Sequence, residues 1–381
     1  MKAVGIIAEY NPFHNGHLYH LEKIKEKEKD AIIVLVMSGN FTERGEVAIM
    51  DKWKRCEIAL NHGVDLVIEL PYPFATQSAD FFSEGSISLL EALKVEKIIF
   101  GSESNDINTL EKIAKVQIEN EDFDKLVKIY SKFGKNYPTA LSCAIEDLTG
   151  EKIDTPNDLL GVSYIKTILK NKYQIKAETI QRTNDYHNTS LEESISSATS
   201  IREALKKGES IENQVPKDTL KYYQNLHFME DYYDLLKYKI LTEDHLEKYQ
   251  TVEEGIEGSL KKAVEKSTNY EELIQNIKSK RYTYNKISRM LLHILCGFTK
   301  EKANSMKKIS YIRILGFSNK GRDYLNKVKK EVELPMISKI NRNKDSMLEF
   351  ELETTKIYDI KTNDCKAKEE SKIIIKGEEN D

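Results

Sequence analysis

The 381 residues of the chain exceed what a single hydrophobic core usually supports, so two domains are expected. Hydrophobic residues make up 40% of the sequence, which excludes a wholly disordered chain, and no apolar run approaches the roughly 20 residues of a membrane-spanning helix. The formal net charge is −4, and the four cysteines are scattered without a CxxC pair, which favours a reducing cytoplasm over a disulfide framework or a zinc site.

The first half of the chain alternates predicted strands with predicted helices. Short runs rich in Val, Ile and Leu predict strands at residues 3–8, 31–37, 64–70, 97–100 and 173–180. Helical periodicity predicts helices at residues 17–27, 50–62, 80–93 and 158–169. The apolar run at the N-terminus is too short for a signal peptide. The pattern indicates an α/β fold with a doubly wound, Rossmann-like parallel sheet, whose ligands bind at the carboxyl ends of the strands.

The second half is predicted to be mainly helical. Residues 206–218, with Gly208 and Pro216 among charged residues, form the expected domain boundary. Beyond it, residues 220–260 and 270–298 predict amphipathic helices. The predicted organisation is a nucleotide-binding domain at residues 1–207, a helical, basic domain at residues 219–345, and a C-terminal part at residues 346–381 with one late strand near residues 373–375 and a charged tail.

A strongly basic segment lies in the helical half. Residues 278–344 contain 18 Lys and Arg against 4 Asp and Glu, a net charge of +14, so the rest of the chain carries −18. Such a segment in an acidic protein predicts a polyanionic partner. Its arginines are interleaved with aromatic residues that can stack on unpaired bases, which favours nucleic acid; a solvated lysine-rich surface is the alternative. These residues are Arg281, Arg289, Arg313, Arg322 and Arg342, with Tyr282, Tyr284, Tyr311 and Phe317.

The turn after the first predicted strand carries the sharpest signal. It contains the sequence His-x-Gly-His at residues 14–17, between a strand and a helix. His14 and His17 are three apart, so both can face one ligand at the helix N-terminus, where free N–H groups favour anions. Gly16 leaves room for a nucleotide to approach. Imidazoles that donate to a phosphate in transfer would stabilise its developing charge, whereas the alternatives are two ordinary surface histidines or a metal pair.

This turn resembles that of the nucleotidyltransferase superfamily, which also contains the class I aminoacyl-tRNA synthetases. Such proteins pair it with a late, basic Ser/Thr-rich motif, and residues 195–202 are the candidate here. Ser197 and Thr199 supply hydroxyl donors near a helix start, and Arg202 can clamp a phosphate through its planar fork, although Ser or Thr before a helix is often only an N-cap. His14, His17 and Arg202 form the expected catalytic set.

Further stretches resemble the bacterial tRNA(Met) cytidine acetate ligase family. They include Ser-Gly-Asn-Phe at residues 38–41, Val-Ile-Glu-Leu-Pro at 67–71, Pro-Asn-Asp-Leu-Leu-Gly at 156–161, Tyr-His at 186–187, Arg-Tyr at 281–282 and residues 312–317. The resemblance implies that acetate is activated with ATP, accompanied by Mg²⁺, as acetyl-adenylate, and that N4 of the wobble cytidine in elongator tRNA(Met) is then acetylated. It also implies acetate and this tRNA as partners, no membrane, and a cytoplasmic location. The oligomeric state stays open.

The resemblance assigns ATP to the first turn and to residues after later strands. Gly101 ends a strand. Its missing side chain either admits an adenine or ribose, or Gly101 is a plain turn glycine. Asn157 follows Pro156 at a helix start and either caps that helix or reads an adenine edge. Arg182 follows the fifth strand and suits a phosphate. The full set comprises Ile7, Ala8, Glu9, Tyr10, Asn11, Pro12, Phe13, His14, Asn15, Gly16, His17, Leu18, Tyr19, His20, Gly101, Asn157, Arg182, Ser197 and Thr199.

Some assignments remain open. Asn40, Arg44, Asp51 and Lys52 follow the second strand and suit either acetate or the incoming cytidine. No Cys or Ser stands in a nucleophile-elbow context, so direct acetyl transfer is expected over an acyl-enzyme.

Two alternative functions are an adenylyltransferase acting on a small coenzyme precursor and a non-catalytic RNA-binding relative. The basic segment argues against the first, and the presence of both histidines argues against the second.

Overall fold

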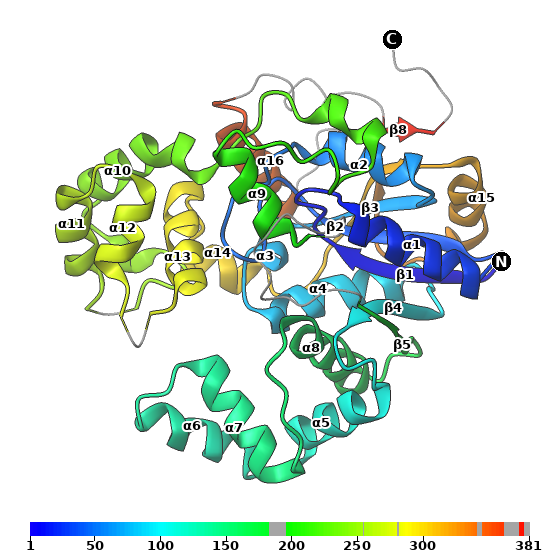
Figure 1. The fold of residues 1–381 in the computed structure, drawn as a ribbon, viewed down its shortest axis with the longest axis horizontal. Coiled ribbons are helices and arrows are strands. Elements are labelled where there is room, and N and C mark those ends of the chain that lie inside the picture. The colour runs from blue at the N-terminus through cyan, green and yellow to red at the C-terminus, as the bar shows by residue number, and fades with distance from the viewer. Residues whose placement is uncertain (183–195, 254, 280–281, 341–344, 362–372, 377–381) are drawn as a thin grey trace.

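The protein is described by a computed structural model that covers residues 1–182, 196–253, 255–279, 282–340, 345–361 and 373–376 (Figure 1). Its centre is a twisted sheet in the order β5-β4-β1-β2-β3-β6-β7, with β8 also paired to β6. The strands β1 (Ala3–Ala8), β2 (Ile32–Ser38), β3 (Leu66–Leu70), β4 (Lys97–Ser102) and β5 (Lys176–Gln181) are mutually parallel. The α/β class and these predicted strands are confirmed, because the buried strands are continuous apolar runs covered on both faces.

The C-terminal half completes the same sheet. Strand β6 (Ile312–Phe317) runs antiparallel to β3, and the short strands β7 (Met336–Ile337) and β8 (Ile374–Ile375) pair with β6. The late strand expected near residues 373–375 is therefore present, whereas β6 and β7 were not expected inside a helical domain. The sheet is mixed because β6 enters it from the opposite direction. The division of the chain into separate domains stays a prediction.

Helices cover the sheet and connect its strands (Figure 1). Helices α1 (Asn15–Lys27), α2 (Lys52–Asn61), α4 (Ala79–Ala92), α8 (Pro156–Asn171) and α9 (Ala198–Lys206) agree with the sequence pattern, and α3 (Tyr72–Ala75) is a short turn before α4. Asp51 begins α2 as an N-cap, because its Oδ1 accepts from the backbone N–H groups of Trp53 and Lys54 at 2.9 Å. Between β4 and α8 the chain forms α5 (Ile107–Glu119) and a helical hairpin of α6 (Phe123–Lys132) and α7 (Tyr137–Thr149).

The helical half consists of more and shorter helices than predicted. Residues 220–260 form the 3-10 turns η1 (Lys217–Tyr222), η2 (Met229–Tyr232) and η3 (Leu246–Lys248), with α10 (Tyr233–Thr242) and the start of α11 (Glu257–Lys266). The chain then forms α12 (Tyr270–Ile277), α13 (Tyr284–Cys296) and α14 (Lys300–Ser305). Helix α16 (Ser346–Tyr358) was missed by the sequence analysis. It is capped by Asp345, whose Oδ1 accepts from Met347 N at 2.9 Å, and it buries Met347, Leu348 and Phe350.

The basic segment does not form one surface. Arg313 of β6 is fully buried, and Tyr282, Tyr311 and Phe317 are buried too, so the expectation that these residues stack on bases and hold phosphates is wrong. The exposed cations Lys320, Arg322, Lys327, Lys329 and Lys330 lie on or just after α15 (Asn319–Val328). The hydroxyl of Tyr324 in α15 donates to the carbonyl of Leu93 at 2.7 Å, just before β4, so α15 lies at the amino ends of the parallel strands. Arg281 and Arg342 lie outside the described residues.

Candidate active site

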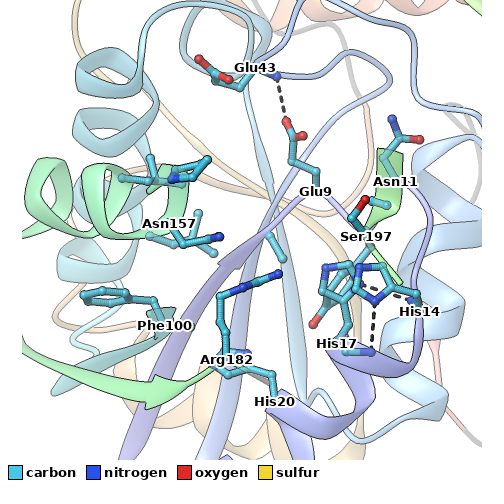
Figure 2. A pocket seen from close by; sticks show the side chains of 18 of the residues that line it. Glu9, Asn11, His14, His17, His20, Glu43, Phe100, Asn157, Arg182 and Ser197 are labelled. Atoms are coloured by element: carbon cyan, nitrogen blue, oxygen red, sulfur yellow. Dashed lines mark hydrogen bonds between the residues drawn. The ribbon is translucent and has the colours of Figure 1, made fainter. Parts of the chain in front are cut away.

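A cavity of about 430 Å³ opens at the carboxyl ends of β1, β4 and β5. Figure 2 shows side chains from the turn after β1, from β4, from α8 and from the segment after β5 converging on it. Most of the residues predicted to bind ATP line it, namely Ile7, Ala8, Glu9, Tyr10, Asn11, His14, Gly16, His17, Tyr19, His20, Gly101, Asn157, Arg182, Ser197 and Thr199, together with Arg202. Sequence segments almost 200 residues apart therefore meet in one place.

Four residues of the predicted turn do not line the cavity. Phe13 is fully buried and packs against Tyr10, with ring centroids 4.8 Å apart, which agrees with a role in the core. Asn15 faces the segment after α9, and its Nδ2 donates to the carbonyl of Asn213 at 2.8 Å. Pro12 and Leu18 are the other two. Phe13 and Asn15 therefore support the turn from outside the cavity.

His14 and His17 form a stacked pair at the start of α1. Their ring centroids are 3.8 Å apart, with an angle of 29° between the planes. His14 is the N-cap residue, and its Nδ1 accepts from the backbone N–H of Gly16 at 3.1 Å, while Nδ1 of His17 accepts from the backbone N–H of His14 at 3.3 Å. Because both Nδ1 atoms accept, each neutral ring carries its proton on Nε2, so each ring can donate one further hydrogen bond.

Burial keeps these imidazoles neutral. It lowers the pKa of His14 to about 3, with the charges of Arg182 and Arg202 adding to the effect, and lowers the pKa of His17 well below its usual range. The pKa of His20, one turn further along α1, falls to about 4 for the same reason. A neutral imidazole with its proton on Nε2 is a hydrogen-bond donor without a charge, and a bound anion would raise the pKa of each ring.

Two arginines supply the positive charge. Arg202 in α9 donates from Nη1 to the carbonyl of Asn11 at 2.9 Å, and its Nη2 lies 3.1 Å from Oε2 of Glu46. Arg182, directly after β5, extends between Asn157 and the histidine pair in Figure 2. Its Nε lies 3.7 Å from Oε1 of Glu103, beyond hydrogen-bond distance. Both arginines line the cavity; Nη1 and Nη2 of Arg202 already contact Asn11 and Glu46, whereas Nε of Arg182 is buried without a hydrogen-bond partner among the described residues.

The structure corrects the reasons given for Gly101 and Asn157. A Cβ at Gly101 would lie 3.2 Å from Cγ of Arg182, so the missing side chain makes room for that arginine, and a contact of Gly101 with a nucleotide stays a prediction. Asn157 does not cap α8, because Thr155 occupies the N-cap position, and its Nδ2 donates instead to Oε1 of Glu103. Both residues therefore lie next to Arg182, Gly101 directly and Asn157 through Glu103.

The hydroxyl motif begins α9 at the cavity. Ser197 is the N-cap residue, and its Oγ accepts from the backbone N–H of Ser200 at 3.1 Å, so the capping alternative holds for this residue. Thr199 accepts at Oγ1 from Nη1 of Arg44 at 3.1 Å. This contact ties α9 to the loop after β2. Ile195, Tyr186 and His187, which belonged to the motifs considered above, lie outside the described residues.

One wall of the cavity is acidic, which the sequence analysis did not anticipate. Glu9 is partly buried and accepts at Oε1 from the backbone N–H of Glu43 at 2.7 Å and from Oγ of Ser38 at 3.2 Å. Burial raises the pKa of Glu9, and it raises that of Glu43 as well, opposed there by Arg289. Glu46 is the third carboxylate. Oε2 of Glu46 lies 3.1 Å from Nη2 of Arg202, so the acidic wall adjoins the arginines of the cavity.

The helical half reaches this acidic wall. Arg289 of α13 places Nη1 2.7 Å from Oε1 of Glu43, and Oγ of Ser288 donates to the carbonyl of Gly45 at 2.9 Å. Arg289 was expected to hold RNA, but it anchors the loop after β2 against α13. The residues that line the cavity all lie between Ile6 and Arg202, and α13 supports one of its loops from outside.

Other residues singled out after β2 serve the scaffold. Lys52 is fully buried and its Nζ lies 2.6 Å from Oε1 of Glu69 in β3, while Asp51 caps α2. Buried Asn40 accepts at Oδ1 from the backbone N–H of Lys52. Of the four residues considered for acetate or cytidine, Arg44 alone lines the cavity.

A buried arginine that the sequence analysis missed fixes the ends of β1 and β2. Arg55 in α2 donates to the carbonyl of Glu9 at 2.7 Å and to that of Ser38 at 3.0 Å, and also bonds the carbonyl of Gly39. Its signal in the sequence was weak, since a single Arg in an amphipathic helix normally faces solvent. The contacts make Arg55 a positioning residue for the first turn.

The described residues contain no group of three or more His, Cys, Asp or Glu arranged to hold a metal ion. Across the same ranges, none of the helices has the length and apolar character needed to cross a bilayer.

The fold and the cavity define a class of protein. A mainly parallel α/β sheet carries a His-x-Gly-His turn at the carboxyl end of β1, with two arginines and a helix N-terminus facing the same cavity. Such a site is suited to a nucleotide whose phosphates lie against neutral donors and guanidinium groups. This is the architecture of a nucleotidyltransferase.

Comparisons with known proteins agree over nearly the whole chain. A model of the family HIGH Nucleotidyl Transferase matches residues 1–372. The tRNA(Met) cytidine acetate ligase of Anoxybacillus flavithermus is 40% identical over 378 residues, with 94% of each chain covered, and that of Geobacillus sp. strain WCH70 is 43% identical over 362 residues, with 90% of each covered. The crystal structure of Thermotoga maritima TmcAL bound with alpha-thio ATP has a TM-score of 0.89 at 31% identity and covers 98% of this chain and 99% of that one.

The chain therefore belongs to the HIGH nucleotidyl transferase family and, within it, to the tRNA(Met) cytidine acetate ligases. The resemblance stated from the sequence is confirmed.

Proposed function

We propose that this protein is an ATP-dependent ligase that activates acetate as acetyl-adenylate and then acetylates N4 of the wobble cytidine of elongator tRNA(Met). The observation that carries the proposal is the stacked pair of neutral histidines, with Nε2 free to donate, at a helix start beside Arg182 and Arg202. The full-length similarity to tRNA(Met) cytidine acetate ligases supports the choice of substrates. We assign His14, His17 and Arg202 to catalysis.

In the first step, an acetate oxygen forms a bond to the α-phosphorus of ATP. The bond from this phosphorus to the bridging oxygen breaks, and pyrophosphate leaves with the electron pair. Negative charge grows on the transferring and leaving phosphates, and Nε2 of both histidines and the guanidinium of Arg202 donate to it. Mg²⁺ would arrive with the triphosphate and take its ligands mainly from phosphate oxygens and water, since the described residues offer no metal-binding cluster of their own.

In the second step, N4 of cytosine attacks the acetyl carbonyl carbon and AMP leaves. The amine loses one proton as the amide forms. The amine is a poor nucleophile because its lone pair is delocalised into the ring, so a mixed anhydride is needed as the donor. The target base must leave the anticodon stack to reach a buried cavity. The acidic wall of Glu9, Glu43 and Glu46 suits the amine edge of cytosine, because carboxylate oxygens accept from N4.

We further propose that the helical part at residues 219–345 contributes to tRNA binding and that the enzyme works in the cytoplasm. The net charge of +14 over residues 278–344 supports the first part, although its buried members Arg313 and Tyr311 cannot contact RNA. Cations that remain exposed there, such as Lys307 and Lys308, are available to phosphates.

The proposal is tested by two assays on one preparation. ATP–pyrophosphate exchange should require acetate and should proceed without RNA. Nucleoside mass spectrometry of elongator tRNA(Met) incubated with enzyme, ATP and acetate should detect N4-acetylcytidine. Exchange that depends on a coenzyme precursor in place of acetate would support an adenylyltransferase, and the absence of any exchange would support a non-catalytic RNA-binding protein.

A further inference from the structure

The α6–α7 hairpin presents a basic and aromatic surface. Between residues 125 and 137 the chain carries four lysines and no Asp or Glu. The exposed side chains that form what we call the hairpin surface are Lys125, Lys128, Ile129, Lys132, Phe133, Lys135 and Tyr137. Phe133 is 79% exposed and Tyr137 62% exposed, which places them among the most exposed large apolar side chains of the described residues.

The geometry of the hairpin puts these groups side by side. Lys125, Lys128, Ile129 and Lys132 follow the spacing i, i+3, i+4 and i+7, so they share one face of α6, opposite the buried Phe123 and Val127. Lys128 and Lys132 have no hydrogen-bond or ion-pair partner among the described residues.

The turn between the two helices is well defined. Gly134 has φ 83°, the left-handed conformation that favours glycine, and Asn136 caps α7 by accepting from Thr139 N at 3.0 Å. Nζ of Lys135 lies 4.6 Å from the ring centroid of Tyr130. The surface is therefore formed by an ordered hairpin with its own buried contacts.

The hairpin surface is linked to the mouth of the cavity. Ala79 and Phe82, in the first turn of α4, line the cavity, and Phe81 between them is 41% exposed. Oγ of Ser142 in α7 donates to the carbonyl of Ile153 at 2.6 Å, three residues before Pro156, which lines the cavity at the start of α8, so α7 contacts the segment that leads into the cavity wall. Figure 1 shows the α6–α7 hairpin and helices α10–α13 extending from the body toward the same side, one below and one above.

We propose that the hairpin surface binds the single-stranded loop of the substrate RNA next to the target cytidine. This inference rests on the proposed function and adds a contact surface to it. Phe133 and Tyr137 offer faces for unpaired bases, and the four lysines offer charge to the adjoining phosphates. A second copy of the chain is the weaker candidate, because four like charges around the aromatic residues would face each other across a symmetric contact.

The test compares three variants of the full chain that keep the cavity unchanged. Phe133→Ala/Tyr137→Ala removes the stacking faces, and Lys128→Glu/Lys132→Glu reverses the charge. Lys170→Glu/Lys176→Glu is the matched control, because the charge change is the same and both lysines are exposed. Lys170 is in the last turn of α8 and Lys176 begins β5, so both lie near the amino ends of the strands, away from the cavity at the carboxyl ends. Circular dichroism checks the fold of each variant.

The Kd for elongator tRNA(Met), measured by filter binding, should rise about five-fold or more in each hairpin variant, the scale of losing one stacked base. It should stay within about two-fold of the wild type in the control, and acetate-dependent pyrophosphate exchange should be unchanged in all three. An unchanged Kd in both hairpin variants overturns the proposal, as does a loss of self-association in sedimentation with normal RNA binding. If the wild type binds tRNA but does not acetylate it, the proposed function fails while the Kd comparison still decides the hairpin.

Discussion

Replacing His14 separates its two roles, which the structure makes distinct. Nδ1 of His14 accepts from Gly16 N and begins α1, while its Nε2 faces the cavity. His14→Ala removes both roles. His14→Asn keeps a side-chain oxygen of the kind that best caps a helix but is too short to place a donor where Nε2 lies. His17→Ala removes a donor and leaves the cap in place.

The magnitudes follow from these contacts. Loss of one donor to the transition state lowers the rate by about 10²–10³, or about 3–4 kcal/mol of activation free energy. We expect this loss in acetate-dependent pyrophosphate exchange for His14→Ala, His14→Asn and His17→Ala. Loss of an N-cap costs about 1 kcal/mol of unfolding free energy, so His14→Ala should also be less stable in urea, whereas His14→Asn should keep most of the wild-type stability.

Two measurements distinguish the catalytic role of His14 from its capping role: the exchange assay at saturating ATP and urea denaturation of the same samples. A His14→Asn variant that exchanges pyrophosphate at the wild-type rate would refute the catalytic role of this imidazole and reduce it to a cap. Normal exchange in His17→Ala would refute the role of the pair as a whole.

Three further outcomes are expected. Gly101→Val sets a branched side chain against Arg182, so the KM for ATP should rise about ten-fold with little change in fold, and an unchanged KM in steady-state kinetics would contradict that contact. Because burial holds the pKa values of the histidine pair and of His20 below neutrality, their imidazole proton resonances in NMR should not titrate between pH 8 and pH 6 in the free enzyme; a midpoint near pH 6.5 would contradict this. Arg289→Glu places a second carboxylate against Glu43, so it should reduce pyrophosphate exchange and tRNA acetylation together, whereas a variant that loses only tRNA acetylation would show that Arg289 acts on RNA alone.

The sequence predicted the part of the site whose residues directly follow a strand or precede a helix. Four of the five parallel strands are buried apolar runs, and β5 is a half-exposed edge strand. The histidines stand directly after the first strand, so the rule that ligands meet the carboxyl ends of parallel strands predicted that His14 and His17 face the cavity. Ser197, Thr199 and Arg202 were predicted from the resemblance to nucleotidyltransferases, which pair the first turn with a late Ser/Thr-rich basic motif, and Ser197 also caps α9.

The parts that were missed depend on long-range packing. Strand β6 contains a buried Arg313, and a charged residue in a short apolar run hides a sheet strand from pattern analysis. Helix α16 buries Glu351, whose Oε2 accepts from the backbone N–H of Tyr72 at 2.7 Å, a contact across 279 residues. The acidic wall was hidden for the same reason, since Glu43 becomes part of the cavity only through Glu9 and Arg289.

The central claim is that acetyl-adenylate forms on the enzyme before RNA arrives. A pulse–chase experiment tests it most directly: enzyme is incubated with ATP and radiolabelled acetate without RNA, and then elongator tRNA(Met) is added with a large excess of unlabelled acetate. We expect about one label per active site to reach the tRNA in spite of the excess. A tRNA product with the specific radioactivity of the diluted acetate pool would contradict it.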